Sequence, residues 1–434
     1  MSDTISRRTI LANGAVAIAT GAVLGDTRAA LAQAGRPPAD QPFTPVHTPN
    51  GVTVPFKLIG GVKVFHLVAR EFEHEFAPGL VAKVWGYNGR SPGPTLELVE
   101  GDRVRVYVTN RLPEATTIHW HGIILPAGMD GVSGLNQPPI PPGETYKYEF
   151  TLKQHGTFMY HSHFDEMVQI GLGMMGMLVV HPKQIDPDRR VDRDFVLMLS
   201  EWRLDPDTTR PKTSEMTDFN LFTINGKAFP GTAPLVCRKG DRVRVRFGNL
   251  SAMDHHPIHI HGHHWTITGT DGGPIPRTAW VPETTILVPV GSTRDVEFVA
   301  DNPGDWAIHC HMTHHTMNQM GHGTPNLIGM DAKGFDTSVK PLLPGYMTMG
   351  QRGMGEHGRH MAHMPLPANS IPMRGADGPQ GYIDMGGMFT ILKIRDVPAI
   401  GYDDPGWYDH PAGTVSAEAS DEELRRDGID PAAQ

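Results

Sequence analysis

The stretch YNGRSPGPTLELVEGDRVRVYVTN, from Tyr87 to Asn110, occurs a second time in the chain in altered form. The second version is INGKAFPGTAPLVCRKGDRVRVRFGN, from Ile224 to Asn249. Both versions end in a run in which apolar and polar residues alternate. Such alternation predicts a β-strand with one buried face. The sequence therefore predicts a fold made of one β unit written twice.

Three further pairs of segments continue the repeat. They are TTIHWHG (Thr116–Gly122) with HPIHIHG (His256–Gly262), PPGETYKYEF (Pro141–Phe150) with VPVGSTRDVEF (Val288–Phe298), and HGTFMYHSH with PGDWAIHCH. The offset between the two copies is 139 residues at Gly101 and Gly240, and 148 residues at His161 and His309. The second copy therefore holds about eight extra residues between its two histidine motifs.

Short alternating runs separated by Gly, Pro and Asn fill both copies, and no segment shows a long helical period. This pattern predicts an all-β chain with two Greek-key sandwich or barrel domains, at residues 55–183 and 190–335. The charged stretch His181–Asp194, which contains prolines, is the expected join. Residues 336–434 are expected to add a Met- and His-rich loop, one strand at Gly386–Val397 and an acidic tail that is disordered from about Val415.

The overall composition limits the possible functions. The chain of 434 residues carries 24 histidines, 22 methionines and two cysteines. Its formal charge of −9 excludes the basic surface expected of a nucleic-acid-binding protein, and also a polybasic membrane patch. Two cysteines allow at most one disulfide, so the chain is not a disulfide scaffold.

Residues 1–34 have the features of an export leader. Arg7 and Arg8 precede a mildly apolar run, Ile10–Leu24, and Ala32-Gln33-Ala34 follows as a cleavage signal. These three features in this order predict a twin-arginine leader rather than an amphipathic N-terminal helix, and hence a periplasmic or secreted protein. The run is too short and too rich in Gly and Ala to span a bilayer, and no other apolar stretch is long enough, so no stable membrane insertion is expected.

The segment GDWAIHCHMTHHTMNQM, from Gly304 to Met320, contains one of the two cysteines. On a strand, His309 and His311 point to one face and Cys310 points to the other. A thiolate, two imidazoles and a distant thioether form the ligand set of a blue copper site. Cys310 can supply the thiolate, while His315 and Met320 follow on the loop that leaves the strand. The second imidazole has to come from another segment, and His256 opens the other motif.

Four H-x-H pairs lie at matching places in the two copies. They are His119/His121, His161/His163, His259/His261 and His309/His311. One H-x-H pair is a weak signal, because exposed histidine pairs are common. Eight imidazoles at strand spacing, two pairs in each copy, are enough for three copper ions, and neutral imidazole is a good copper ligand.

The repeat also offers an internal comparison. When the offsets are subtracted, His256 corresponds to Thr116, Cys310 to Ser162, His315 to Met167 and Met320 to Leu172. All four ligands of the thiolate site are thus absent from the first copy, whereas its H-x-H histidines are complete. The ligands are gained or lost as a set, as expected of a metal site.

Four segments, HWHG, HSH, HPIHIHGH and HCHMTHHTMNQM, resemble the copper motifs of the multicopper oxidases, the laccase-like enzymes. The resemblance extends over about Phe65–Met330. It implies two cupredoxin-like domains and copper as the cofactor: one type 1 ion, one type 2 ion and a type 3 pair. The type 1 copper is expected at Cys310, His256, His315 and Met320.

The resemblance also assigns the other histidines. Type 2 copper is expected at His119 and His259. One type 3 copper is expected at His121, His161 and His311, and the other at His163, His261 and His309. The flanking His255, His263, His264 and His314 fit no ligand position, and Cys237 is expected to be a buried apolar residue.

The family resemblance implies a mechanism as well. A small reducing substrate gives single electrons to the type 1 copper, the electrons pass through Cys310 to His309 or His311, and O2 is reduced to two waters. Asp130 lies where the family carries an acid that supplies protons, although a turn role before Gly131 fits equally well. Many members carry a carboxylate directly after the last type 1 histidine. Here that residue is Thr316, so the proton route is expected to differ.

Two-domain members of the family form homotrimers, in which the first copy of one chain faces the second copy of the next. The resemblance therefore implies a homotrimer for this chain, with the cluster histidines divided four and four between the domains.

The reducing substrate remains open between Cu(I), a phenol and Mn(II). Eight methionines and three histidines between Met347 and Met388 favour Cu(I), because thioethers bind it well, and hence a cuprous oxidase in copper tolerance. A flexible lid whose methionines pack on the surface is the alternative. A copper nitrite reductase would carry its cysteine in the first copy and lack a type 3 pair, and a non-catalytic copper-binding protein would have lost ligands, so both are less favoured.

Overall fold

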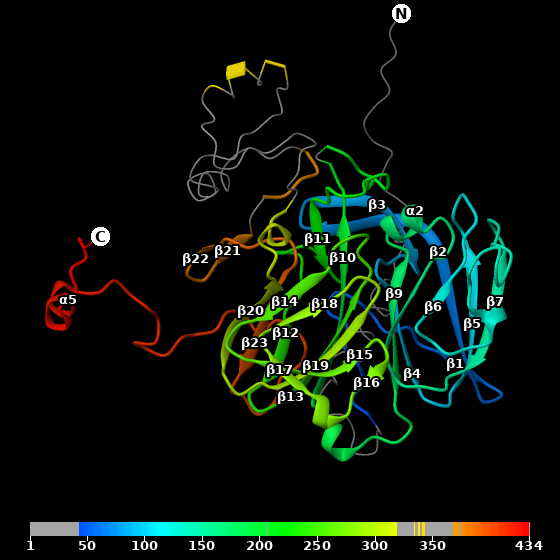
Figure 1. The fold of residues 1–434 in the computed structure, drawn as a ribbon, viewed down its shortest axis with the longest axis horizontal. Coiled ribbons are helices and arrows are strands. Elements are labelled where there is room, and N and C mark those ends of the chain that lie inside the picture. The colour runs from blue at the N-terminus through cyan, green and yellow to red at the C-terminus, as the bar shows by residue number, and fades with distance from the viewer. Residues whose placement is uncertain are drawn as a thin grey trace, which may run out of the picture.

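The computed structural model describes residues 43–205, 207–318, 334, 337–338, 341–342, 368–372 and 375–433. The predicted leader, the proposed ligand Met320 and most of the Met- and His-rich segment lie outside these residues. Among the described residues the regular structure is mostly strand, with 43% of residues in strands and 8% in helices, which confirms the all-β fold class. Figure 1 shows the first domain as the strands coloured from blue through cyan to blue-green, and the second domain as the green to yellow strands together with one orange strand from late in the chain.

The first domain consists of two sheets. In one sheet, β1 (Lys57–Ile59), β2 (Val62–Ala77), β5 (Arg103–Asn110) and β7 (Thr145–Thr151) lie side by side, and β3 (Leu80–Tyr87) pairs with β2. The other sheet has the order β4 (Gly93–Val99), β9 (Met175–His181), β8 (Gly156–His161) and β6 (His119–His121). Apolar side chains of both sheets, among them Trp120 and Tyr148, form one buried core.

The second domain repeats this order. One sheet runs β11 (Leu221–Ile224), β10 (Arg193–Trp202), β13 (Arg242–Asn249), β19 (Thr293–Val299), β15 (Trp265–Thr270) and β16 (Gly273–Pro274), with β17 (Val281–Glu283) on β15. The other runs β12 (Leu235–Arg238), β23 (Phe389–Arg395), β20 (Gly304–Cys310), β14 (His256–Ile260) and β18 (Thr285–Val288). The pairings β2–β5 and β4–β9 are parallel, and so are their counterparts β10–β13 and β12–β23.

Strand β23 corrects the predicted domain limit at residue 335. In the first domain β9 follows β8 closely, and His161 pairs with Met175. In the second domain His309 pairs with Phe389, 80 residues later in the chain. The Met- and His-rich segment is therefore an insertion between two neighbouring strands of the second domain rather than an extension after it.

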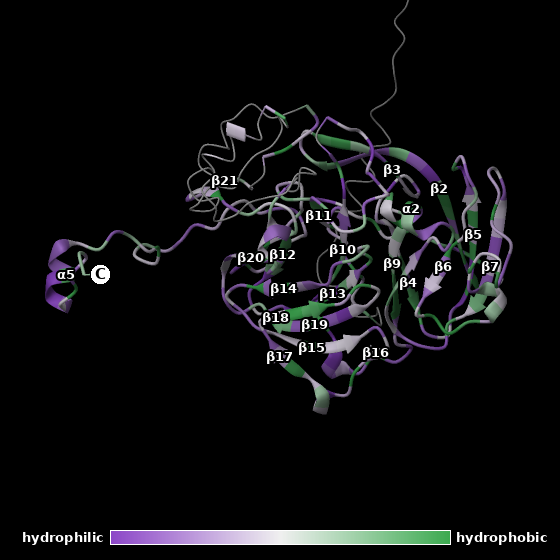
Figure 2. Cartoon of the chain, turned by 45° about the horizontal axis from the view of Figure 1, so that its top comes forward, coloured by the Kyte–Doolittle hydropathy of each residue, from purple (hydrophilic) through white to green (hydrophobic). Residues whose placement is uncertain are grey.

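The remaining elements are short. Beyond residue 335 the sequence predicted one strand, whereas the structure also contains the hairpin of β21 (Ala376–Gly378) and β22 (Gly381–Ile383). The tail, expected to be disordered, carries α5 (Asp421–Asp427), an exposed helix that begins with a capping box at Ser420. In Figure 2 this helix is largely hydrophilic, whereas the strands carry both kinds of residue. Within the described residues, no helix is both long and apolar enough to cross a bilayer.

The two domains are joined by buried contacts. Thr157 on β8 donates to Asp295 on β19 (2.6 Å), and Arg246 on β13 donates to the hydroxyl of Thr157 (2.8 Å). A second seam forms where His74 on β2 meets the carbonyl of Gly226 at 2.6 Å. These contacts fix how the two histidine-bearing sheets lie relative to each other.

Candidate metal centres

Strand β20 places its histidines and its cysteine on opposite faces, as the alternation predicts. Cys310 pairs with Ile258 on β14, and its side chain is fully buried in the core of the second domain. His309 pairs with His259 and faces away from that core. The strand ends at Cys310, and the short helix η4 (Thr313–Thr316) then turns His315 back toward the thiol.

Three proposed ligands meet in this core. The Sγ atom of Cys310 lies 3.5 Å from Nδ1 of His315 and 3.8 Å from Nδ1 of His256, and the two Nδ1 atoms are 3.2 Å apart. All three side chains are buried. A thiolate and two imidazoles that face one another match the donor set of a blue copper site, so these residues fit the ion that the family resemblance implies.

Burial sets the protonation of these ligands. Burial lowers the pKa of His256 to about 3 and that of His315 to about 4, so both imidazoles are neutral at pH 7 and can act as ligands. Burial also raises the pKa of the Cys310 thiol to about 12. Binding of a cation would have to release the thiol proton, as is usual for thiolate metal sites.

The second nitrogens of both rings have partners. The hydroxyl of Ser251 lies 2.6 Å from Nε2 of His256, and a carboxylate oxygen of Asp254 lies 3.3 Å from Nε2 of His315. The ring of Phe222 stacks on His315 at 4.0 Å between centroids. These contacts orient each ring so that Nδ1 points to the thiol. The sequence prediction missed Ser251, Asp254 and Phe222, because only the spatial neighbourhood connects them to the site.

The first domain gathers its four histidines where β6 and β8 end. The ring centroids of His119 lie 5.3 to 5.7 Å from those of His121, His161 and His163. His119 donates from Nδ1 to the carbonyl of Asp130 (2.8 Å), and His161 donates from Nδ1 to the carbonyl of Ser162 (2.8 Å). These bonds leave Nε2 of both rings as the nitrogen that could bind a metal, and Nε2 of His161 lies 3.3 Å from Nδ1 of His121.

The second domain repeats this arrangement at β14 and β20. The ring of His259 lies 4.9 to 5.6 Å from those of His261, His309 and His311. His259 donates from Nδ1 to the carbonyl of Thr284 (2.8 Å), and His309 donates from Nδ1 to the carbonyl of Cys310 (2.8 Å). The two domains thus present two equivalent groups of four imidazoles.

The two imidazole groups do not share members. Each close set of three possible metal ligands found among the described residues belongs to one domain: His119, His121 and His161 in the first, and the thiolate site in the second. In the second domain His261 and His311 are exposed. Within one chain, each group is therefore half of the eight-imidazole set that the resemblance implies.

Asp130 lies at the edge of the first group. One of its carboxylate oxygens is 3.4 Å from Nδ1 of His119, and its side chain is one-third exposed. The carboxylate therefore contacts both solvent and a predicted type 2 ligand.

The remaining predicted residues are easily placed. Cys237 and Cys310 are both free and buried, so the described chain forms no disulfide. His255, His264 and His314 are exposed, and His263 packs between Phe298 and Trp306.

One residue differs from the sequence alignment. Met167, which aligns with His315 by sequence, is exposed, and the buried side chain on its helix is that of Gln169. On helix α2 (Glu166–Gly171), the residue in the place of His315 is therefore Gln169, two residues after the one that the sequence alignment indicates.

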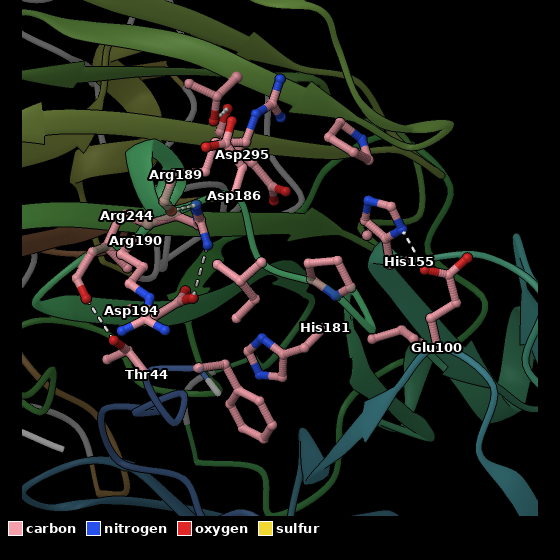
Figure 3. Close-up of a pocket in the computed structure, with 18 of the residues that line it drawn as sticks. Thr44, Glu100, His155, His181, Asp186, Arg189, Arg190, Asp194, Arg244 and Asp295 are labelled. Carbon is pink, nitrogen blue, oxygen red and sulfur yellow. Dashed lines mark hydrogen bonds and ion pairs between the residues drawn. The ribbon is translucent and has the colours of Figure 1, made fainter. Parts of the chain in front are cut away.

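A large cavity of about 1410 Å³ opens between the two domains, away from these ligands. Figure 3 shows the charged residues that line it. Arg246 donates to both carboxylate oxygens of Asp194 (2.7 and 2.9 Å), and Arg244 contacts the same group. Burial raises the pKa of Asp194, but the two guanidinium groups outweigh burial and leave it below its usual value. The charged part of the cavity wall is thus largely paired, and none of the proposed copper ligands lies in the wall.

Comparison with known proteins defines the class. Family models described as multicopper oxidase match residues 70–185 and 205–326. The chain is 31% identical to a solved multicopper oxidase, mgLAC, with a TM-score of 0.58, over 77% of this chain and 87% of that one. The chain therefore belongs to the multicopper oxidase family, which confirms the resemblance and implies copper of types 1, 2 and 3 as the cofactor.

Two curated relatives share a name. The chain is 32% identical to copper resistance protein A of Escherichia coli, over 64% of this chain and 52% of the relative. It is 31% identical to a copper resistance protein A homolog of Pseudomonas syringae pv. tomato, over 74% of this chain and 65% of the relative. The chain thus spans about half to two thirds of the length of these relatives.

Proposed function

We propose that the protein is an oxidase that passes single electrons from a small reducing substrate to O2 and forms water. The buried group of His256, Cys310 and His315 carries this proposal, because it lies one residue from the imidazoles of His309 and His311. Family membership and the two imidazole groups support it further.

The proposed ligands divide into two centres. His256, Cys310 and His315 would hold the type 1 copper, with Met320 as the fourth ligand. The eight H-x-H histidines would hold the other ions, with His119 and His259 at the type 2 copper. The type 3 ions would be held by His121, His161 and His311, and by His163, His261 and His309. Bound copper would supply reversible one-electron chemistry at the first centre and O2 reduction at the second.

The chain itself connects the two centres. Cys310 is bonded through the backbone to His309 and His311, and its carbonyl also accepts the 2.8 Å hydrogen bond from the ring of His309. Covalent bonds and one hydrogen bond therefore give a path between the centres that is one residue long.

Proton supply is the second task of the chain. The carboxylate of Asp130 is in contact with solvent and lies 3.4 Å from the ring of His119. We propose that it passes protons toward the cluster.

The cluster is proposed to form between chains of a homotrimer. Each chain presents half of the imidazoles in each domain, and His261 and His311 are exposed. Ile124 and Met312 closely follow two of the histidine motifs and are exposed, and so is Leu287 on β18, the strand that pairs with β14. Exposed apolar groups next to half a metal site are expected where a second chain binds.

A complementation experiment tests the shared cluster. His121→Ala disables the first-domain group, and His311→Ala disables the second-domain group, so each variant alone should lack oxidase activity. When both variants are expressed together, some contacts between chains join the intact first-domain group of the His311→Ala chain to the intact second-domain group of the His121→Ala chain. Mixed trimers should therefore recover part of the activity. Mixed trimers without activity would contradict the shared cluster. So would a protein that is fully active in the oxidase assay and monomeric by light scattering.

Cu(I) is the proposed substrate, as part of copper tolerance. The Met- and His-rich insertion leaves and rejoins the fold beside the thiolate site. Asn318 donates to the carbonyl of Pro372 (3.1 Å) and accepts from the amide of Gly387 (2.8 Å), and the amide of Met388 donates to the carbonyl of His315 (2.9 Å). Thioethers favour Cu(I), and the relatives named copper resistance protein A support the same choice.

A deletion tests the substrate. The end of the insertion belongs to the folded core, because Ile371 is buried in one cluster with Trp202 and Asn369 accepts a hydrogen bond from the amide of Val81 (2.8 Å). The deletion should therefore remove residues 347–364 only. It should lower the rate with Cu(I) more than the rate with a bulky phenol, which needs only access to the edge of a type 1 histidine. Equal losses would favour a phenol or Mn(II).

Export is proposed through the twin-arginine leader, which would place the protein in the periplasm or outside the cell. Replacing Arg7 and Arg8 by lysine should leave the unprocessed chain in the cytoplasm. Normal export of that variant would contradict the leader.

A further inference from the structure

The place in the first domain that corresponds to the thiolate site is closed by a side-chain amide. Gln169 on α2 is fully buried. Its Oε1 accepts from the hydroxyl of Ser162 (2.6 Å) and from that of Thr116 (2.7 Å). Its Nε2 donates to the carbonyl of Ala115 (2.8 Å). Every polar atom of the amide is thus engaged.

These partners stand where the copper ligands stand in the second domain. Thr116 corresponds to His256 in the segment that leads into the first H-x-H pair. Ser162 corresponds to Cys310, in the middle of the second pair. Gln169 follows the strand on a helical turn, as His315 follows Cys310 on η4. The amide therefore joins the first-domain counterparts of the three elements that His256, Cys310 and His315 bring together in the second domain.

This junction lies next to the imidazole group of the first domain. Ser162 lies between His161 and His163, and the amide of His163 donates to the hydroxyl of Thr117 (3.2 Å). The pairing of β6 with β8 sets the register of the two H-x-H pairs, and Gln169 adds a side-chain link between Ser162 and Thr116, which lie next to these histidines. In the second domain a copper ion bound to His256, Cys310 and His315 would form the equivalent link.

We propose that Gln169 is a positioning residue of the copper cluster, and that its amide does in the first domain what a bound ion does in the second. This inference rests on the proposed assignment of the H-x-H histidines to that cluster. Gln169 itself binds no metal. It acts through Ser162 and Thr116 on the spacing of His119, His161 and His163, on which the geometry of type 2 and type 3 copper depends.

The test is the copper content and the electron paramagnetic resonance spectrum of Gln169→Leu. Leucine keeps much of the volume but makes none of the three hydrogen bonds. We expect the type 1 signal to remain, while the type 2 and type 3 ions are retained about tenfold more weakly, as usual when a residue that orients metal ligands is lost. Gln169→Glu keeps the Oε1 acceptor and should restore part of this copper, which a purely space-filling role would not predict.

A matched control separates positioning from general stability. Asn88 accepts from the amide of Val68 (2.7 Å) in a turn of the same domain, far along the chain from the histidines. Asn88→Ala should lower the melting temperature but keep all copper signals.

Several outcomes would decide against the proposal. A complete type 2 and type 3 complement in Gln169→Leu would overturn it, and so would loss of these ions in Asn88→Ala. If Gln169→Leu does not fold, an unaltered type 2 spectrum in Gln169→Ala decides against it. Absence of type 2 copper from the unmodified protein would instead refute the proposed function.

Discussion

The two domains share one framework but differ in the chemistry at a single place. Asn110 donates to the carbonyls of Glu114 (2.8 Å) and Ile140 (2.9 Å), and its counterpart Asn249 donates to those of Asp254 (3.0 Å) and Val288 (3.0 Å). The turn residues Asn88 and Asn225 both have positive φ angles, and each accepts from a neighbouring strand at 2.7 Å. Backbone capping by polar side chains therefore preserves the fold in both domains.

The difference lies in what joins the two histidine motifs. In the second domain, two imidazoles and a thiol face one another, whereas in the first an amide and two hydroxyls fill the equivalent space. Both groups are buried, but only the thiol and the two imidazoles of the second domain form a donor set suited to copper. On the proposed assignment, three side chains in each domain decide whether the fold can carry electrons, while the strands remain the same.

The largest effect is expected from Cys310→Ser. Loss of the only thiol beside His256 and His315 should abolish the blue absorbance and reduce substrate oxidation to background, while the fold survives. Cys237→Ser is the matched control, because Cys237 is also fully buried but lies on β12 away from any ligand. That variant should lose roughly 1–3 kcal/mol of stability through an unpaired buried hydroxyl but stay blue. A blue Cys310→Ser protein would refute the type 1 assignment.

A paired substitution tests the common framework. Asn110→Ala and Asn249→Ala each remove a buried amide that caps two carbonyls, so each should lower the free energy of unfolding by about 2–4 kcal/mol. Chemical denaturation of the copper-free proteins measures this. The copper spectra should differ, because Asn249 holds the amide of Ser251 (2.9 Å), whose hydroxyl contacts His256. Only Asn249→Ala should change the type 1 signal, and an equal change in both variants would contradict the comparison.

Two partly buried histidines at the contacts of the domains should make stability depend on pH. Burial lowers the pKa of both His47, which stacks on Tyr402, and His74 from 6.5 to about 4. Because the unfolded chain binds these protons more readily, their contribution is complete above pH 6.5 and is lost as pH falls toward 4. Each should contribute about 1–3 kcal/mol over that range. His74→Gln should flatten the dependence, whereas His66→Gln, at an exposed position, should leave it unchanged.

The smallest effect concerns one charge near the thiolate site. Asp254 lies 3.3 Å from Nε2 of His315, whereas its first-domain counterpart Glu114 contacts no proposed ligand in the described structure. Asp254→Asn removes a negative charge and should raise the type 1 reduction potential, with a change of about two- to fivefold in kcat/KM. Glu114→Gln should change neither quantity. Equal potentials in both variants would mean that Asp254 does not influence the centre.

The sequence predicted much of this structure because two signals repeat. Alternating runs such as Arg103–Val108 predicted the strands, and the H-x-H spacing predicted which histidines share a face. The group of His256, Cys310 and His315 was also predicted, because a strand, a loop and the other motif leave few partners for the thiol.

Other features could not be predicted from spacing. Gln169 was missed because α2 and η4 leave their strands differently, so the aligned residue Met167 faces solvent. Strand β23 was read as part of an extension, because its sequence resembles β9 too weakly to reveal a repeat interrupted by a long insertion. Ser251 and Asp254 come into contact with His256 and His315 only in the folded structure, so no sequence pattern connects them to the site. Short-range patterns are visible in one sequence, but contacts set by loops are not.

The most direct measurement is electron paramagnetic resonance on the copper-loaded protein, combined with its copper content per chain. Type 1 copper in the second domain only, together with a shared cluster, predicts type 1 and type 2 signals in equal amounts and a further pair of ions that gives no signal. Two type 1 signals per chain, or a type 1 signal without any type 2 signal, would contradict this division of chemistry between the domains.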